Sequence, residues 1–551
     1  MVERELKWRL TPSAWSAFQS QLALPPRLIL EQRNYYFDDP ERRLALGSSM
    51  LRLRWESGKW IWCYKRGVSL EGGYFAAVEV ETELNESQAQ RLLEGDSQGL
   101  ESTPTARELA AQGLEGPWER VGEIANRRQV WEGSLVGLKG GERLELDETT
   151  FGPGLVEYEL EIETADPQGA RQVIEGLAAR GGWSLEVQRA TKYERFLKYY
   201  YERQPLVSIL MPLYNCEATL INALRSVAWQ TFPGWELILV DDGSQDDTLE
   251  LAKSWCRNEP RAKLIAQEHG GIESALNRAL AESRGAYIAR MDSDDISHPK
   301  RLARQLEYLA AHPEIQAVGS KVRIFPSAQL TEGMERYQRW LNKTLTPELI
   351  ERDMLVESPL VHPSVLMRRA AVESLGAYVA GSWPEDYHLW LRFWSRRWAL
   401  GKVDEVLLYW RDSPQRLTRV DPRCSHDSLR NLKVDFFLRT FWGAEEGGWS
   451  LPPDKRRLII WGAGPNGKAL VKTLRAKGLE PAYFTDILPA RHGQTICGLR
   501  VLPLEGLPDP RDYFLLTAVG NPYSREEIRA FLRARGWLEG RDFYCMAGIS
   551  D

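Results

Sequence analysis

Three carboxylates stand within four residues at Asp292, Asp294 and Asp295, directly after the apolar segment 286–289. Carboxylates this close repel one another, and a divalent cation that prefers oxygen ligands is the usual means of keeping them ionised. Mg²⁺ or Mn²⁺ bound there would take a diphosphate as a further ligand. A solvated acidic turn is the alternative, because aspartate is a favoured turn residue. The surrounding sequence therefore decides between the two.

Strand-like apolar segments alternate with helical patterns around this acidic cluster. The segments cover residues 207–213, 236–240, 263–266 and 286–290, and apolar side chains at helical spacing lie between them. Such alternation predicts an α/β fold with a parallel sheet, whose ligands bind beyond the carboxyl ends of the strands. We therefore expect one pocket to collect the polar residues that follow three of the strands, namely Tyr214, Asn215, Asp241, Asp242, Asp292, Asp294 and Asp295.

Residues 205–440 resemble the family 2 glycosyltransferases of the GT-A fold, which transfer a sugar from a nucleotide diphosphate. The resemblance rests on ordered motifs at residues 207–215, 230–231, 235–244, 271–277, 292–295 with Arg301 and Gln305, 357–363 and 384–390. It implies a metal-dependent transfer in one displacement, and therefore inversion at the sugar.

The same resemblance assigns roles to individual residues. Asp386 corresponds to the general base, and Asp292 and Asp294 correspond to the ligands of the metal and the diphosphate. Asp242 corresponds to the residue that contacts the nucleotide base. The residues implied to bind the nucleotide-sugar donor are Pro212, Tyr214, Asn215, Asp241, Asp242, Asn277, Arg290 and Asp292.

Several motif residues have a structural alternative. Glu385 and Asp386 precede an apolar helical stretch, where acids also cap a helix and favour its dipole. His362 and His388 are expected to be structural, because a histidine near an apolar stretch is more often a satisfied core group than a catalyst. A sugar nucleotidyltransferase would carry a glycine-rich loop with a basic residue after its first strand; residues 211–215 read Met-Pro-Leu-Tyr-Asn, which favours transfer.

The first two hundred residues repeat another pattern, in which charged and apolar side chains alternate. Residues 3–7, 51–55, 78–83 and 157–163 each place their charges on one face of a strand, and the charges are acidic in some strands and basic in others. A single strand of this kind is typical of a half-buried antiparallel sheet with a wet face. Several together predict a closed barrel with a charged interior, suited to a polyphosphate and its metal.

Glu3-x-Glu5-x-Lys7 is also the signature of the CYTH or triphosphate tunnel metalloenzyme family, which residues 1–200 resemble. The resemblance implies hydrolysis of inorganic or thiamine triphosphate, or cyclisation of ATP, with inorganic triphosphate as our default. Implied metal ligands are Glu3, Glu5, Glu159 and Glu161, with Glu79, Glu81 and Asp147 as further candidates. Implied triphosphate ligands are Lys7, Arg52, Arg54, Lys65, Arg128 and Lys192, although the strand register leaves Arg127 as an alternative to Arg128.

The last hundred residues contain a strand-like segment followed by a glycine-rich turn. Gly462, Gly464 and Gly467 form G-x-G-x-x-G before a helical stretch, and Asp486 stands where a ribose-binding acid would stand in a dinucleotide-binding unit. The segment resembles a small Rossmann-like domain. NAD or another nucleotide is one expectation, and a module without a cofactor, used for packing or donor positioning, is the other.

Length and charge set the remaining limits. At 551 residues and 63.0 kDa the chain is long for one core, and its net charge of −6 argues against a general nucleic-acid binder. Six scattered cysteines without zinc spacing are expected to be reduced. The charged N-terminus and the lack of a membrane-length apolar run predict a cytoplasmic protein and leave peripheral membrane association open.

The sequence thus predicts a multidomain enzyme. An antiparallel β tunnel barrel of the α+β class covers residues 1–202, a GT-A domain covers 205–440, a linker covers 441–455, and an α/β Rossmann-like domain covers 456–551. We expect a glycosyltransferase that uses a nucleotide-diphosphate sugar and a glycan or other hydroxyl acceptor, fused to a triphosphatase. The rival hypotheses make the outer domains non-catalytic binding or regulatory modules, or make the whole chain a scaffold of degenerate folds.

Overall fold

The structure is a computed structural model that describes residues 5–22, 25–40, 42–47, 49–70, 74–132, 137–138, 142–152, 154–327, 330–414, 416–441 and 455–548. Glu3 lies outside these residues, and Glu5 is described as a backbone position only. Contacts between residues divide the chain into two compact units, Met1–Arg203 and Gln204–Asp551. Among the described helices, none is long and apolar enough to cross a membrane.

The first unit is an antiparallel sheet that closes on itself. The strand order is β5-β4-β3-β2-β6-β7-β8-β1-β9, and β5 also pairs with β1, which joins the two ends of the sheet into a barrel. The strands are β1 Glu5–Leu10, β2 Leu28–Asp38, β3 Ser49–Glu56, β4 Lys59–Leu70, β5 Tyr74–Leu84, β6 Glu119–Glu132, β7 Arg143–Gly152, β8 Leu155–Glu163 and β9 Glu186–Val187. The predicted tunnel barrel is therefore present.

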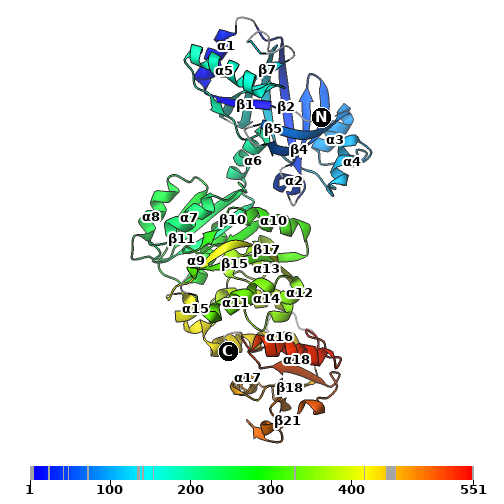
Figure 1. Ribbon diagram of the computed structural model, residues 1–551, viewed down its shortest axis with the longest axis vertical. Helices are drawn as coiled ribbons and strands as arrows, with labels where there is room; N and C mark the ends of the chain where they lie inside the picture. The colour runs from blue at the N-terminus through cyan, green and yellow to red at the C-terminus, as the bar shows by residue number, and fades with distance from the viewer. Residues whose placement is uncertain are drawn as a thin grey trace. The chain divides into compact units, whose positions relative to one another are not determined.

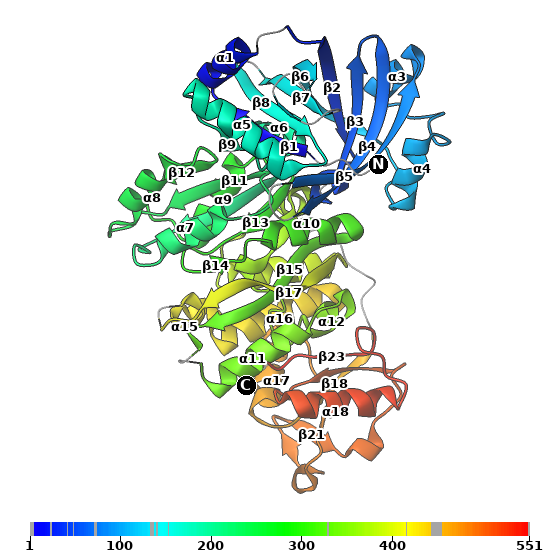
Figure 2. The same ribbon diagram turned by 45° about the horizontal axis from the view of Figure 1, so that its top comes forward.

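Two apolar clusters cover the outside of this barrel. The helices α1 Pro12–Gln21 and α5 Pro167–Gly181 pack on β1, β7 and β8, while α3 Glu86–Leu93 and α4 Pro104–Ala111 pack on β2 to β5. Figure 2 shows these two helix pairs against different sides of the barrel. Successive side chains of β7 point to opposite faces of the sheet. Leu144 and Leu146 belong to the apolar cluster outside the barrel, whereas Glu145 and Asp147 form ion pairs with Arg128 inside it. Two further helices of this unit are α2 Arg43–Leu46 and α6 Lys192–Arg203.

The second unit begins with an eight-stranded mixed sheet in the order β12-β11-β10-β13-β16-β15-β17-β14. All four strands predicted around the acidic cluster are present and parallel to one another. The strands are β10 Val207–Leu213, β11 Trp235–Asp241, β12 Ala262–Ala266, β13 Tyr287–Arg290, β14 Ile296–Ser297, β15 Ile315–Phe325, β16 Leu366–Arg368 and β17 Ala399–Arg411.

Helices flank this sheet and bury its apolar strands. Ala275, Leu276 and Ala279 of one helix pack on Leu210 and Ile238 of the two central parallel strands. The helices are α7 Leu220–Ala228, α8 Thr248–Cys256, α9 Ile272–Glu282, α10 Arg301–Ala311, α11 Glu332–Lys343, α12 Pro347–Asp353, α13 Arg369–Ser374, α14 Glu385–Ser395, α15 Leu417–Val420 and α16 His426–Phe441 (Figure 1). This arrangement is GT-A-like.

The described part of the C-terminal segment, residues 455–548, forms a third sheet, which we call the C-terminal module. Its order is β20-β21-β19-β18-β22-β23, and every pair is parallel except β20 with β21. The elements are β18 Arg457–Trp461, α17 Pro465–Ala476, β19 Tyr483–Thr485, β20 Thr495–Ile496, β21 Leu499–Leu502, β22 Tyr513–Thr517, α18 Pro522–Arg533 and β23 Phe543–Cys545.

One continuous core joins the C-terminal module to the preceding α/β fold. Phe437 and Phe441 of α16 lie 5.4 and 5.5 Å from the ring of Phe514 in β22, between ring centroids. A buried ion pair adds to this interface, because Arg529 of α18 donates to Asp353 of α12 and each side chain is 1% exposed. The module and the α/β fold therefore pack as one compact unit.

We expect Arg529→Ala to lower the free energy of unfolding by about 3–5 kcal/mol, because it leaves the buried Asp353 carboxylate without this partner. Burial raises the pKa of Asp353, but Arg352 and Arg529 outweigh burial and hold it below its usual range. Urea denaturation followed by tryptophan fluorescence measures the loss. Arg511→Ala is the matched control, since Arg511 is 86% exposed in the same module; equal losses in the two variants would contradict the prediction.

Candidate functional site

The acidic cluster lies at the carboxyl end of β13, beside the ends of β10 and β11. One oxygen of each of Asp292, Asp294 and Asp295 lies within 4.8 Å of the others. Burial and the Asp292 charge raise the pKa of Asp294 to about 6, and the same causes raise the pKa of Asp295. The strand end thus concentrates negative charge in a partly buried position.

Two arginines of the second unit approach this cluster from the end of β17. Arg411 donates its backbone N–H to Asp295 at 2.7 Å and its Nε to the Asp294 carbonyl at 2.7 Å. Arg416 lies over the Trp410 ring at 3.8 Å and lowers the pKa of Asp294 and Asp295 through its charge. Sequence reasoning missed both arginines, because no motif connects them with an acidic cluster more than a hundred residues earlier.

Asp242 lies in a cradle of donors that follows β11. Its carboxylate accepts the backbone N–H groups of Gly270 and Gly271, both at 2.9 Å, and the side chain of Gln267 at 2.7 Å. His269 Nδ1 lies 2.9 Å from the same carboxylate. The predicted base-contacting acid is therefore fixed at the loop that leads into α9.

Other predicted donor-binding residues surround the same strand ends. The Tyr214 ring, 48% exposed, stacks on His269 with a centroid distance of 4.4 Å. Asn215 adopts φ 47° and accepts the Gln245 N–H, while Asp241 accepts the Ser244 N–H. The amide of Asn277 instead binds both backbone groups of Tyr378, at 2.8 and 3.0 Å, which ties α9 to the segment after α13.

The predicted general base, Asp386, begins the first turn of α14. Burial and the neighbouring Glu385 raise the pKa of Asp386 to about 7, and the Asp292 carboxylate is near enough to add to this effect. Burial alone would raise the pKa of Glu385, but His362 and Arg290 outweigh it and hold that pKa low. The two adjacent acids therefore differ in protonation near neutral pH.

A buried polar chain links the acidic cluster to α14. Arg290, 2% exposed, pairs with Asp292, and its charge also reaches Glu385. His362 has Nδ1 3.5 Å from Glu385 and shares a hydrogen bond of 3.0 Å with the Tyr378 hydroxyl. Burial lowers the pKa of His362, and the Glu385 carboxylate beside it opposes this effect.

Three further motif residues support the backbone. Gln230 bonds Ser297 and the His298 carbonyl, and Gln305 bonds the carbonyls of Val318 and Ser364. Arg301, 1% exposed, donates to the carbonyls of Arg290 and Pro363. These side chains position the strand end that carries the acidic cluster. His388, stacked on Trp383, has its pKa lowered by burial to about 3, as expected of a structural histidine.

A second acidic cluster lies inside the barrel of the first unit. Oxygens of Asp147, Glu159 and Glu161 lie within 4.8 Å of one another, and all three side chains are buried. Lys192 Nζ lies 2.7 Å from Asp147 and 2.8 Å from Glu159 and also pairs with Glu161. Lys7 pairs with Glu161 at 3.1 Å. Of the predicted residues, the acids Asp147, Glu159 and Glu161 and the cations Lys7 and Lys192 thus lie together in the barrel interior.

Arg128 and Arg127 lie on opposite faces of β6. Arg128 reaches Asp147 at 2.6 Å and Glu161 at 2.7 Å, whereas Arg127 pairs outside with Glu31, which is 68% exposed. Arg128 is therefore the interior residue of the two. Glu145 and Arg195, which sequence reasoning left out, also join the network through Arg128 and Glu159 respectively.

The other predicted phosphate ligands line β3 and β4. Arg52 lies 3.3 Å from Glu79, Arg54 lies 3.1 Å from Glu81, and Lys65 lies 3.3 Å from Glu79. Burial raises the pKa of Glu79, but Lys65 and Arg52 outweigh it and hold the value at about 2. This wall of the barrel therefore carries permanent charges of both signs.

The predicted glycine-rich turn follows β18 in the C-terminal module. A Cβ on Gly467 would lie 1.8 Å from the Gly462 carbonyl, so the turn requires glycine there. Asp486, predicted to hold a ribose, accepts the N–H groups of Ala463 and Leu488 at 2.8 and 2.9 Å and pairs with Arg491 at 2.8 Å. Its carboxylate is thus used to hold the turn together.

Both acidic clusters fit a divalent cation. In the α/β fold the buried Asp295 Oδ2 has no hydrogen-bond partner, and in the barrel the same is true of Glu159 Oε1. Both donor sets consist of carboxylate oxygens, the ligands that Mg²⁺ and Mn²⁺ prefer. Asp292, Asp294 and Asp295 would hold the ion in the first case, and Asp147, Glu159 and Glu161 in the second.

Comparisons with family models locate two matches in the chain. The model of glycosyl transferase family 2 matches residues 208–376, and the CYTH domain model matches residues 1–196. Among solved structures, a Hippeastrum adenylyl cyclase protein described as having a dominant triphosphatase activity is 29% identical, covering 35% of this chain and 94% of that one, with a TM-score of 0.32. TarS of S. aureus in complex with UDP-GlcNAc is 20% identical, covering 42% and 66%, with a TM-score of 0.35.

Curated relatives of the chain include glycosyltransferases. The glycosyltransferase EpsE of Bacillus subtilis is 33% identical over 220 residues, which are 39% of this chain and 76% of EpsE. The amylovoran biosynthesis glycosyltransferase AmsE of Erwinia amylovora is 32% identical over 206 residues, which are 37% and 75% of the two chains. The chain therefore belongs to the family 2 glycosyltransferases and carries a CYTH domain at its N-terminal end.

Proposed function

We propose that the α/β fold after residue 204 transfers a sugar from a nucleotide-diphosphate donor to a hydroxyl acceptor with inversion, and that the reaction depends on Mg²⁺ or Mn²⁺. One observation carries the proposal. The acidic cluster after β13 and the first turn of α14 lie near enough for Asp292 to raise the pKa of Asp386. A diphosphate-binding cluster and a base with a pKa of about 7 would therefore act on the same donor and acceptor.

In this mechanism Asp386 accepts the proton of the acceptor hydroxyl while the acceptor oxygen attacks the anomeric carbon. A carboxylate with a pKa near the working pH is suited to that step. Glu385 stays ionised beside His362 and keeps the pKa of Asp386 high.

The donor is held from the opposite side of the pocket. Asp242, fixed by the glycine N–H groups, lies against the nucleotide base, and the exposed Tyr214 ring offers a flat surface for stacking. The guanidinium charges of Arg411 and Arg416 offset the negative charge of the leaving diphosphate. Asp292, Asp294 and Asp295 would hold a divalent cation, which would supply further charge stabilisation to that leaving group.

For the barrel we propose hydrolysis of a triphosphate, with inorganic triphosphate as the substrate. Lys7, Arg128 and Lys192 bind phosphate oxygens in this proposal, and Arg52, Arg54 and Lys65 extend the basic surface along the opposite wall. Asp147, Glu159 and Glu161 hold the cation. A ligand-binding role is the second candidate, because each of these six basic side chains already pairs with an interior acid.

For the C-terminal module we propose a Rossmann-like fold that does not bind NAD. Dinucleotide-binding units use the acid after the second strand for a ribose hydroxyl. Asp486 stands there, yet its carboxylate already accepts two backbone N–H groups and an arginine.

Replacing Asp386 by Asn tests the general base. We expect the transfer rate to fall by about 10²- to 10⁴-fold while the KM for the donor stays nearly unchanged, because the base acts on the acceptor. A screen of nucleotide sugars with Mg²⁺ or Mn²⁺ first identifies the donor, and release of the nucleoside diphosphate then gives the rate. Asp404→Asn is the control, since Asp404 is 68% exposed; full activity of the Asp386 variant would remove the proposed base.

The pH dependence of transfer provides a second test. Asp386 must be deprotonated to act, so the rate should rise with pH through about 7 and level off above it. Glu385→Gln removes the adjacent negative charge, and the rise should then move to lower pH. Initial rates between pH 5 and 9 measure both profiles; a Glu385 variant with an unmoved midpoint would disagree with the proposed coupling.

The barrel is tested by a matched pair of neighbouring residues. Arg128→Gln should raise the KM for tripolyphosphate by about tenfold or more, because it removes a charge-assisted phosphate contact. Arg127→Gln, on the outer face, should leave hydrolysis nearly unchanged. Release of phosphate with Mg²⁺ is the measurement. Tripolyphosphate that binds to the parent protein without being hydrolysed would favour the ligand-binding candidate.

A further inference from the structure

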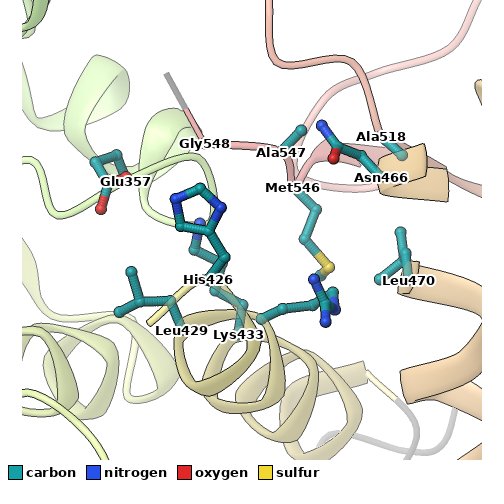
Figure 3. A pocket seen from close by; sticks show the side chains of 11 residues that line it. Glu357, His426, Leu429, Lys433, Asn466, Leu470, Ala518, Met546, Ala547 and Gly548 are labelled. Atoms are coloured by element: carbon teal, nitrogen blue, oxygen red, sulfur yellow. The ribbon is translucent and has the colours of Figure 1, made fainter. Parts of the chain in front are cut away.

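A cavity lies between α16 and the C-terminal module, away from the acidic cluster. Its empty volume is about 490 Å³, part of which is open to solvent. Figure 3 shows the side chains around it. The lining residues come from four places: one face of α16, the first turns of α17, the ends of strands of the C-terminal module, and Glu357 in the segment after α12.

One face of α16 supplies the basic side chains of this cavity. His426, Arg430 and Lys433 stand at i, i+4 and i+7, so a helix places all three on the same side. Arg430 is anchored by Nε to the Thr473 hydroxyl at 3.1 Å and by a second nitrogen to Asp427. Lys433 is 4% exposed and donates to the Val356 carbonyl at 2.7 Å. Glu357 is the one acid among the lining residues.

The opposite wall is the carboxyl edge of a parallel sheet. Ala518 follows β22, residues 546–548 follow β23, and Asn466 stands in the first turn of α17 after β18. The chain leaves β18 toward β19 and returns on the other side of β18 as β22, so the strand order reverses between these two strands. Ligands of open α/β sheets bind in the crevice at such a reversal. The cavity lies at this crevice.

The wall also carries hydrogen-bond donors for an anion. The first turn of α17 presents backbone N–H groups that an α-helix does not pair internally, together with the Asn466 side-chain amide. The N–H of Ala463 is not among them, because it is bonded to Asp486. The positive charges of α16 therefore face donors of the C-terminal module across one small cavity.

We propose that this cavity binds a small phosphate-bearing ligand, either free phosphate or a phosphate monoester, between Arg430 and Lys433 of α16 and the first turn of α17. The ligand is not a dinucleotide, since Asp486 is committed to the glycine-rich turn. The site requires both halves of the second unit, because its charges come from α16 and its backbone donors come from the C-terminal module. None of the lining residues belongs to the acidic cluster, and the proposal does not rest on the proposed transfer.

Methyl NMR on the full-length chain labelled with [¹³C]methyl-methionine tests this site. Met546 lines the cavity, Met291 adjoins the acidic cluster, and Met50 lies in the barrel domain, so one of the eight methionines reports on each region. Inorganic phosphate, glucose 1-phosphate and AMP are titrated separately, and Met546→Leu identifies the signal. We expect at least one probe to shift Met546 in a saturable way, and the tightest probe distinguishes free phosphate from an ester.

Two variants make the test specific. Arg430→Gln and Asn466→Ala should each weaken the response of Met546 by about tenfold, which is the loss expected for one charge-assisted or well-placed contact. Arg500→Gln, an exposed arginine of the same module, should leave it unchanged. The proposal is overturned if Met546 does not respond to any of the three probes, or if the response is the same in both cavity variants as in the parent.

Discussion

Repulsion between clustered carboxylates is the constraint on which both sites of this protein depend. Asp292, Asp294 and Asp295 converge at one strand end, and Asp147, Glu159 and Glu161 converge inside the barrel. Charges buried this close are costly unless cations compensate them. In the barrel, Lys7, Arg128 and Lys192 supply these cations, and their charges hold the pKa of Glu161 well below its usual range. At the cluster of the α/β fold, burial and the charge of Asp292 outweigh the nearby arginines, so the pKa values of Asp294 and Asp295 rise.

Neighbouring charges also give the two acids at the start of α14 different pKa values. Glu385 and Asp386 are adjacent and both lie in a buried site, yet the pKa of one is lowered and that of the other is raised. The difference arises from neighbours, because Glu385 faces His362 and Arg290 while Asp386 faces Glu385 and Asp292. Paired titratable groups with diverging pKa values are a mark of acid and base assignments. The capping interpretation of these acids explains their place on the helix but not this divergence.

Sequence reasoning located the four parallel strands around the acidic cluster because these depend on local periodicity, and the CYTH resemblance pointed to the acids of the barrel. Alternation along β8 predicted its acidic face, the CYTH resemblance implied Asp147, Glu159 and Glu161, and apolar runs ending in polar residues identified the strand ends of the α/β fold. What periodicity could not supply was the packing of residues distant in sequence. Arg411 and Arg416 reach the acidic cluster only because β17 pairs with β14, and the choice between Arg127 and Arg128 needed the register of β6 against β7. The association of Asn277 with Tyr378 likewise depends on how α9 meets a segment a hundred residues later.

The helix α16 shows why the C-terminal module matters to the central fold. It packs against α14, which carries Asp386, and its other contacts are with α17 and the aromatic residues of β22. Leu432, Val434 and Phe437 of α16 are buried in the apolar core that the α/β fold and the C-terminal module share. A movement of α16 away from either part would therefore expose apolar side chains. Arg529 and Asp353 add an ionic contact that is buried on both sides. Densely packed interiors transmit displacement because they have few voids to absorb it. A change in the C-terminal module that moves α16 must therefore reach the first turn of α14, where the protonation of Asp386 is set by distances to its neighbours.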